Sequence, residues 1–242
     1  MSRQWRLLDL QALDTRLDQI EHRRRHLPEL AKLTELTGRA DELDTELVRA
    51  RTDESDVQRE VTKAEADVQL VRDRMARNQS RLDAGQGSAK DLQALQHEIG
   101  SLTKRQSDLE DVELEVMERA EELLARVGEL AGQREELTRE VEELESSRDA
   151  ALHELDAERD KVVAERVDVA AGVGEDLLAL YDRIRSNSGG VGAAALTQRR
   201  CGGCQLELNQ VDLSRFRSAE EDEVLRCEEC RRILVRTAES GL

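Results

Sequence analysis

The sequence predicts a mainly α-helical protein, in which a long antiparallel coiled-coil hairpin carries a small C-terminal β-type zinc ribbon. Charged residues make up 38% of the 242 residues and aromatic residues only 1%, so a wide core built on rings is not available. Apolar residues recur at heptad spacing over most of the chain, which favours long helices over disorder. The only four cysteines form two CxxC pairs near the C-terminus.

The first predicted element is a helix that is interrupted near Pro28. Apolar side chains follow a 3-4 spacing from Leu10 to Leu27, and a second series, out of phase with the first, runs from Leu36 to Leu82. Because proline removes a helix hydrogen bond and crowds the preceding turn, we expect a kink or a break there. The series ends at residues 83–90, where two glycines predict a loop and a serine can cap the next helix.

The second predicted arm runs from Leu92 to Val162 at the same spacing. If the chain folds back at the loop, residue i lies opposite roughly residue 173 − i. The first arm ends at residue 1, so the second arm has no partner beyond about residue 172. Two glycines, at 172 and 174, break the second arm at this point. This coincidence predicts an intramolecular coiled-coil hairpin over residues 1–172, followed by a short helix and a Gly-rich linker over residues 173–192.

Polar residues interrupt both apolar series. They are Glu54, Asn78, Gln106, Glu113, Arg134 and Arg148. Such residues either fix the register of a coiled coil or are tolerated by a long two-stranded seam, and we prefer the second interpretation.

The four cysteines form two pairs of identical spacing, Cys201 with Cys204 and Cys227 with Cys230. Four thiolates that converge at about 2.3 Å from one ion are the ligand set of a structural Zn²⁺, and each CxxC turn presents two of them. The alternatives are iron in a rubredoxin-like site, a disulfide pair, or a redox-active CxxC. The aromatic surroundings of the first and the βαβ context of the third are missing. We therefore expect one structural zinc, with no coordination position left open for catalysis.

Strand-like segments around the cysteines complete a predicted C4 zinc ribbon over residues 193–242. These segments are Ala194–Gln198, Gln205–Leu208, Val224–Arg226 and Ile233–Arg236, with the polar stretch Asn209–Asp222 between them. A ribbon this small holds little core of its own, so the metal is expected to stabilise it.

Several stretches of the chain resemble a known bacterial family, the C4-type zinc-ribbon proteins with an N-terminal coiled-coil hairpin. The stretches that carry the resemblance are Asp91–Ile99, Leu177–Arg185, Gly189–Ala193, Cys201–Cys204 and Arg226–Leu234. The resemblance implies a zinc-bound ribbon on a long helical hairpin and a role in binding partners rather than in catalysis. The partners proposed for such proteins are nucleic acids and proteins of the transcription or secretion machinery.

Arginines gather on the ribbon and form the candidate partner-binding surface. The candidate residues are Arg199, Arg200, Arg215, Phe216, Arg217, Arg231 and Arg232. Arginines beside an exposed ring can clamp phosphate and stack a base, which favours nucleic acid. The competing interpretation is that Phe216 fills the ribbon core while the arginines pair with neighbouring acids. Residues 187–242 contain 8 arginines against 9 acidic residues, so the ribbon as a whole is not basic.

Charge and missing motifs narrow the function further. The formal net charge is −17, and the residues before 187 carry 29 basic against 45 acidic residues, so most of the chain repels phosphate. No catalytic triad, phosphate-binding loop, signal peptide or membrane span is expected. We predict a non-catalytic cytoplasmic adaptor for macromolecular partners, with no small-molecule substrate. It binds either nucleic acid through the ribbon or proteins alone, in a scaffold or chaperone-like role.

The three aromatic side chains predict how the ribbon and the hairpin meet. Trp5 begins the first arm, Tyr181 follows the break in the second, and Phe216 lies in the ribbon. Because apolar surface that neither part can bury alone is buried jointly, we expect the ribbon to dock on the base of the hairpin. The side near Arg215 and Arg217 is then expected to face outward.

Overall fold

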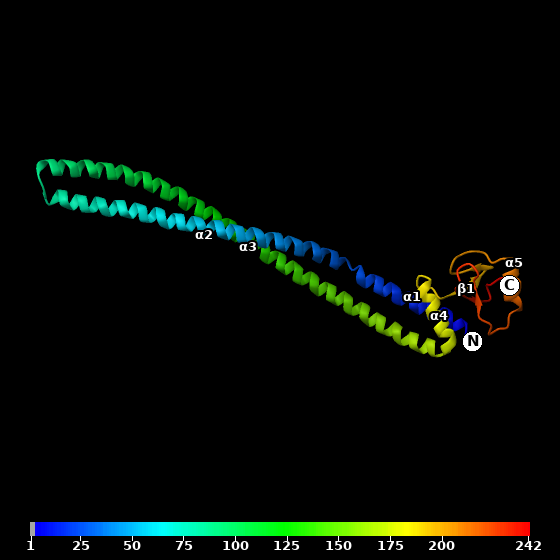
Figure 1. The fold of residues 1–242 in the computed structure, drawn as a ribbon. Helices are drawn as coiled ribbons and strands as arrows, with labels where there is room; N and C mark the ends of the chain where they lie inside the picture. Colours follow the sequence, from blue (N-terminus) through cyan, green and yellow to red (C-terminus); the bar gives the residue numbers. More distant parts are fainter. Residues whose placement is uncertain (1–2) are drawn as a thin grey trace. The chain divides into compact units, whose positions relative to one another are not determined.

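The structure, a computed structural model, describes residues 3–242 and is mainly helical (Figure 1). Its helices are α1 Trp5–Arg25, α2 Pro28–Asp83, α3 Ala89–Ala171, α4 Glu175–Asn187 and α5 Gln210–Ser218. Its strands are β1 Ala193–Thr197, β2 Arg200–Cys201, β3 Leu225–Arg226 and β4 Ile233–Arg236. The chain divides into two compact units, one formed by Lys32–Leu144 and the other by the residues up to Ala31 together with Glu145–Leu242.

The Lys32–Leu144 unit is an antiparallel pair formed by α2 and the first part of α3, which lie side by side in Figure 1. Apolar seam residues of both helices share two buried clusters; one contains Val57, Val61 and Val116, and the other contains Leu43 and Leu130. The residue nearer the start of α2, Leu43, packs with the residue farther along α3, Leu130, so the two helices are antiparallel. This arrangement confirms the predicted helical hairpin. The heptad pattern is the cause, because it places one apolar stripe on each helix.

The loop between the two helices contains a capping box at its end. The Ser88 hydroxyl oxygen accepts a bond from the Asp91 backbone N–H at 3.3 Å, and the Asp91 carboxylate accepts one from the Ser88 backbone N–H at 2.8 Å. These bonds satisfy two backbone donors that would otherwise have no partner at a helix start. The hydrogen bonds to Ser88 lower the pKa of Asp91.

The other unit contains the break between α1 and α2. Backbone hydrogen bonding of α1 ends at His26, whose N–H donates to the carbonyl oxygens of His22 and Arg23. Ile20 of α1 is fully buried with Leu155 and Val162 of α3. The break therefore comes immediately before Pro28, where the proline ring prevents a continuous helix.

The ribbon is a four-stranded sheet in the order β2-β1-β4-β3. The central strands β1 and β4 are parallel, and each has an antiparallel partner at the edge. Alternate residues of the central strands face opposite sides. Ala193 and Ile233 pack with α1 and α4 in one buried cluster, whereas Ala194 and Leu234 join the core of the ribbon. One face of the sheet thus packs on the base of the hairpin, and the other covers the ribbon's own core.

Two predicted features of the ribbon are wrong. The Gln205–Leu208 segment makes only an isolated bridge, between Glu207 and Arg200, rather than a strand. The polar stretch Asn209–Asp222 contains the helix α5, whose cap is the Asn209 side chain accepting from the Asp212 N–H at 2.8 Å. The helix was missed because only two of its side chains, Leu213 and Phe216, are buried.

The ribbon docks on the base of the hairpin as expected, but the three aromatic rings do not share this contact. Tyr181 is buried in the cluster between the sheet and the hairpin base, and Phe216 is buried in the separate cluster on the other face of the sheet. Trp5 is 42% exposed. Leucine, isoleucine and valine side chains, such as Leu10 and Ile233, fill the contact instead.

Candidate metal centre and anchored ribbon

The two CxxC turns bring the four cysteine sulfur atoms together at one edge of the ribbon core. All four Sγ atoms lie within 4.8 Å of one another. The Sγ atoms of Cys201 and Cys230 are 3.7 Å apart, and those of Cys204 and Cys227 are 3.9 Å apart. All four cysteines are free of disulfide bonds.

These distances fit a tetrahedral zinc site. Sulfur atoms at about 2.3 Å from a central ion stand about 3.8 Å apart along a tetrahedron edge. The two measured separations are 3.7 and 3.9 Å, whereas a disulfide would need about 2.05 Å. The four thiolates hold one structural zinc, and because they fill its coordination sphere, its chemistry is to cross-link the two turns.

Both turns use the same backbone device. The residue after each second cysteine has a left-handed conformation, with φ of 64° at Gln205 and 63° at Arg231. Its N–H donates to the carbonyl oxygen of the first cysteine of its turn, at 2.8 Å in the first turn and 2.9 Å in the second. This conformation turns the chain sharply enough to point both thiols of a pair at one centre.

The glycines of the first turn allow the close approach of neighbouring atoms. A Cβ at Gly202 would lie 2.8 Å from the carbonyl oxygen of Ala195, and one at Gly203 would lie 2.6 Å from the Arg232 side chain. Side chains at these positions would displace β1 or Arg232, which explains why this turn is built with glycine.

The surroundings of the thiols act on their pKa values in opposite directions. Burial raises the pKa of Cys201 to about 12 and also raises the pKa of Cys227. Burial acts in the same sense on Cys230, but hydrogen bonds with Arg232, Cys227 and Cys201 together outweigh it and lower the pKa of Cys230 to about 7. Zinc binds the thiolate form, so bound metal competes with protons at all four sulfurs.

A buried polar network anchors the linker that leads into the ribbon, and it was not predicted from the sequence. Gln11 of α1 donates to the Gly190 carbonyl oxygen at 2.9 Å and accepts from the Gly192 N–H at 2.7 Å. Gly192 itself packs against the Tyr181 ring, where a Cβ would lie 2.8 Å from ring carbons. Gln11 is only 8% exposed. The sequence does not predict this, because most other polar residues of α1 are exposed.

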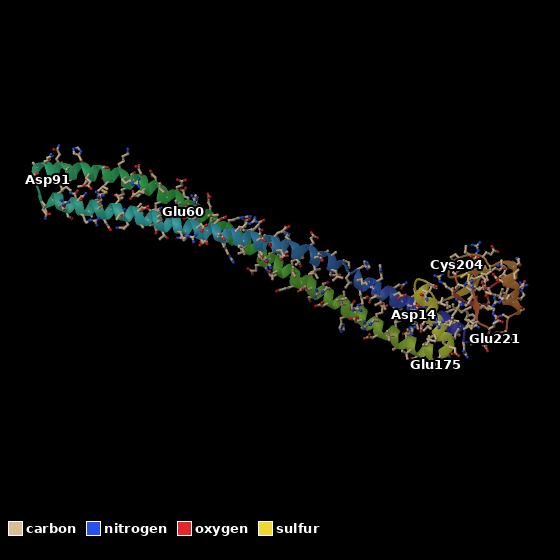
Figure 2. All side chains as sticks on the ribbon, in the orientation of Figure 1. Asp14, Glu60, Asp91, Glu175, Cys204 and Glu221 are labelled. Carbon is tan, nitrogen blue, oxygen red and sulfur yellow. The ribbon has the colours of Figure 1, made fainter. Side chains whose placement is uncertain are left out.

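Asp14 is the centre of the same network, and its exposure is only 2%. The Tyr181 hydroxyl donates to Asp14 at 2.7 Å, and the Arg166 guanidinium donates to it at 2.6 Å. Arg185 lies 3.5 Å from the carboxylate and pairs with Asp18 at 2.7 Å. Burial, reinforced by the bond to Asp14, raises the pKa of Tyr181 above its ordinary value. Asp14 is labelled among the side chains of α1 in Figure 2.

The predicted partner surface is largely used by the ribbon itself. Phe216 is 1% exposed, so it cannot stack a base. The prediction that Phe216 belongs to the partner-binding surface is wrong. Arg232 donates to the carbonyl oxygens of Val191 and Ser188 at 3.0 and 2.6 Å. It therefore ties the second CxxC turn to the linker.

Two more candidate arginines pair with acids of the ribbon. Arg215 lies 4.0 Å from Glu223 and 3.7 Å from Glu228, and Arg231 lies 3.2 Å from Glu228. Arg199 is exposed and donates to the Gly241 carbonyl oxygen. Arg200 and Arg217 are exposed and have no ion-pair partner within residues 3–242.

The basic cluster at the end of α1 is likewise paired with acids. Arg23 pairs with Glu158 at 2.8 Å, and Arg25 pairs with Glu21 at 2.8 Å. Arg24 lies 3.4 Å from Asp156. This cluster therefore offers little free positive charge.

Comparison with known proteins agrees with this architecture. Residues 10–189 match the family described as the CT398-like coiled coil hairpin domain, and residues 200–234 match the C4-type zinc ribbon domain. An uncharacterised protein of Mycobacterium tuberculosis is 36% identical over 236 residues, which cover 98% of this chain and 96% of that protein. Both matched domains are of kinds that bind or scaffold other molecules.

Two solved structures share the fold. A protein of Mycobacterium smegmatis superposes with a TM-score of 0.85 at 36% identity, covering 98% of this chain and 100% of the other. CT398 of Chlamydia trachomatis superposes with a TM-score of 0.69 at 16% identity, covering 97% and 98% of the two chains. Among residues 3–242, no helix is both long and apolar enough to span a bilayer.

Proposed function

Because the chain belongs to the CT398-like coiled-coil hairpin family, we propose that it is a non-catalytic adaptor whose partners are proteins. The ribbon is a rigid end piece in this proposal, fixed by zinc and by the Gln11–Asp14–Tyr181 network, and the hairpin offers the binding surface. The zinc has no open position for substrate, which supports a structural role for the metal rather than an enzymatic one. Thiolate ligands persist in a reducing compartment, so we place the protein in the cytoplasm.

The observation that carries the choice of protein over nucleic acid is the pairing of the ribbon arginines. A nucleic-acid surface needs free guanidinium groups and, for single strands, exposed rings. Here Phe216 is buried, Arg232 holds the linker, and Arg215 faces two glutamates. The acidic hairpin adds long-range repulsion for phosphate.

A second candidate function, nucleic-acid binding, rests on the remaining exposed arginines. Arg199, Arg200 and Arg217 are exposed on the ribbon. These three arginines could form a weak phosphate-binding patch, since contacts to a nucleic-acid backbone need only a few basic side chains. This candidate predicts binding without base specificity.

An affinity purification from cells, with and without nuclease, tests the proposal. Protein partners are expected to be recovered equally in both samples by mass spectrometry, and sequencing of the eluate is expected to show no enriched nucleic acid. The matched variant carries Arg200→Glu and Arg217→Glu and should retain the same partners. Loss of all partners after nuclease, or in this variant, would favour the second candidate.

A further inference from the structure

Along residues 114–131 of α3, the two flanks of the hairpin seam in the Lys32–Leu144 unit differ in chemistry. Nearer the loop, the ion pair Arg72–Glu110, at 2.6 Å, also crosses the flank that is apolar in this stretch. One flank is formed by the residues that directly precede a seam residue in the sequence. Three ion pairs join α2 and α3 on this flank: Arg74–Glu98 at 2.5 Å, Arg119–Glu60 at 2.9 Å and Arg126–Glu46 at 3.3 Å. Glu60 of this flank is labelled in Figure 2. This flank is thus closed by charged side chains that bridge α2 and α3.

The opposite flank carries apolar side chains over the same stretch of α3. Met117 and Leu124 directly follow the seam residues Val116 and Leu123, and their exposures are 40% and 60%. Leu114, one turn earlier, is 57% exposed. Three large apolar side chains on one side of a solvated helix are a feature that interaction surfaces share.

These residues form a second heptad row on α3. Leu114, Met117 and Leu124 continue into Gly128 and Ala131, so the spacing of apolar or small residues repeats the 3-4 pattern with Glu121 as its one interruption. Residues at this spacing lie on one face of a helix. A Cβ at Gly128 would meet no atom within 4 Å, so a partner backbone can approach there. We call the five residues 114, 117, 124, 128 and 131 the outer stripe.

The border of the outer stripe is acidic. The three arginines of α3 in this stretch, Arg119, Arg126 and Arg134, all pair with carboxylates of α2. Glu118, Glu121 and Glu122 are exposed, and none has an ion-pair partner in the described chain. Residues 32–144 contain 17 basic and 29 acidic residues. A second copy of this acidic unit would be repelled, whereas a basic helix would be attracted.

We propose that the outer stripe is a docking site for a basic amphipathic helix of a partner protein. The helix lays its apolar face along the stripe and places lysines or arginines beside the unpaired glutamates of α3, in the manner of a helix bound in a groove. The proposal deepens the adaptor function proposed above and rests on it.

A pair of synthetic helical peptides tests the proposal on the full-length, zinc-loaded protein. Both carry leucine and alanine at heptad spacing; the outer positions are lysine and arginine in one and glutamate in the other. Fluorescence anisotropy should show saturable binding of the basic peptide and at least about tenfold weaker binding of its acidic twin. The stripe variant Leu114→Gln/Met117→Gln/Leu124→Gln should weaken binding of the basic peptide by at least about tenfold.

The matched control changes equally exposed apolar residues off the stripe. Leu70→Gln/Val112→Gln replaces side chains that are 65% and 48% exposed, and it should bind the basic peptide like the wild type. Equal binding by the stripe variant, or equal binding of both peptides, would overturn the proposal. Sedimentation that shows a dimer lost only in the stripe variant would overturn it in favour of a second copy. If the peptide fails while purified protein partners remain bound, the docking site is wrong and the adaptor function stands.

Discussion

Tyr181 shows how single side chains fix the ribbon to the base of the hairpin. Its ring packs among the apolar side chains of α1, α4 and the sheet. Its hydroxyl donates to Asp14 at 2.7 Å and lies 3.2 Å from the side-chain oxygen of Gln11. A buried carboxylate of this kind is stable only while its donors remain in place. The hydroxyl therefore supports Asp14 directly and lies beside Gln11, which holds the linker.

Replacing Tyr181 by phenylalanine removes one donor and leaves the ring. The free energy of unfolding, measured by denaturant titration, should fall by about 1–3 kcal/mol because the buried Asp14 carboxylate loses a donor. Arg217→Ala, at an exposed position, serves as the control and should change stability little.

The same residue predicts a pH dependence. The pKa of Tyr181 is raised above 10.0 in the folded protein, so the folded state keeps the phenol proton when the unfolded chain begins to lose it. This contribution to stability is complete below pH 10 and declines as pH rises further. Denaturant titrations above pH 10 should show a steeper loss for the wild type than for Tyr181→Phe. Identical slopes would mean that the phenol titrates normally.

At the same scale, each zinc ligand is expected to be essential for the ribbon. Cys227→Ser should lose the zinc, measured as metal per chain, and with it the packed ribbon of residues 193–242. The helical circular dichroism of the hairpin should persist, because the heptad seam does not depend on the metal. The control, Arg217→Ala, keeps all four thiols and should retain one zinc per chain. Iron or no metal in the wild-type protein would contradict the assignment of a zinc site.

Helices and strands differed in how well the sequence predicted them. The seam positions of α2 and α3 follow from periodicity, because burial of one stripe is a local property of each helix. The helix α5 buries only Leu213 and Phe216. Two apolar residues are too few to distinguish a helical periodicity from a polar loop. The network around Asp14 was unpredictable because its partners lie 152 and 167 residues away in the chain.

The register of the hairpin can be tested by crosslinking. Val61 and Val116 lie in one buried cluster, so cysteines at these positions should be joined within one chain by a short thiol-specific crosslinker. The control pair combines position 116 with the exposed Val48 and should remain uncrosslinked. Products of doubled mass for the first pair would mean that the helices pair between chains.

At the scale of the molecule, zinc, ribbon and hairpin base act as one assembly. Trp5 lies in a cleft lined by Gln4 of the hairpin base and by Ala219, Glu221 and Arg236 of the ribbon. Because the chain has one tryptophan, its fluorescence reports on this contact alone. Stripping the zinc should shift the emission to longer wavelength as the ribbon unfolds, and adding zinc back should reverse the shift.

The central claim, that the partners are proteins rather than nucleic acids, is tested most directly by a binding titration. Labelled single-stranded RNA and duplex DNA are titrated with the zinc-loaded protein over a series of salt concentrations, and fluorescence anisotropy is measured. Since the ribbon arginines are largely paired and the hairpin is acidic, we predict no saturable binding at any salt concentration. Saturable binding that weakens linearly with the logarithm of salt concentration, and that Arg200→Glu/Arg217→Glu abolishes, would contradict the account.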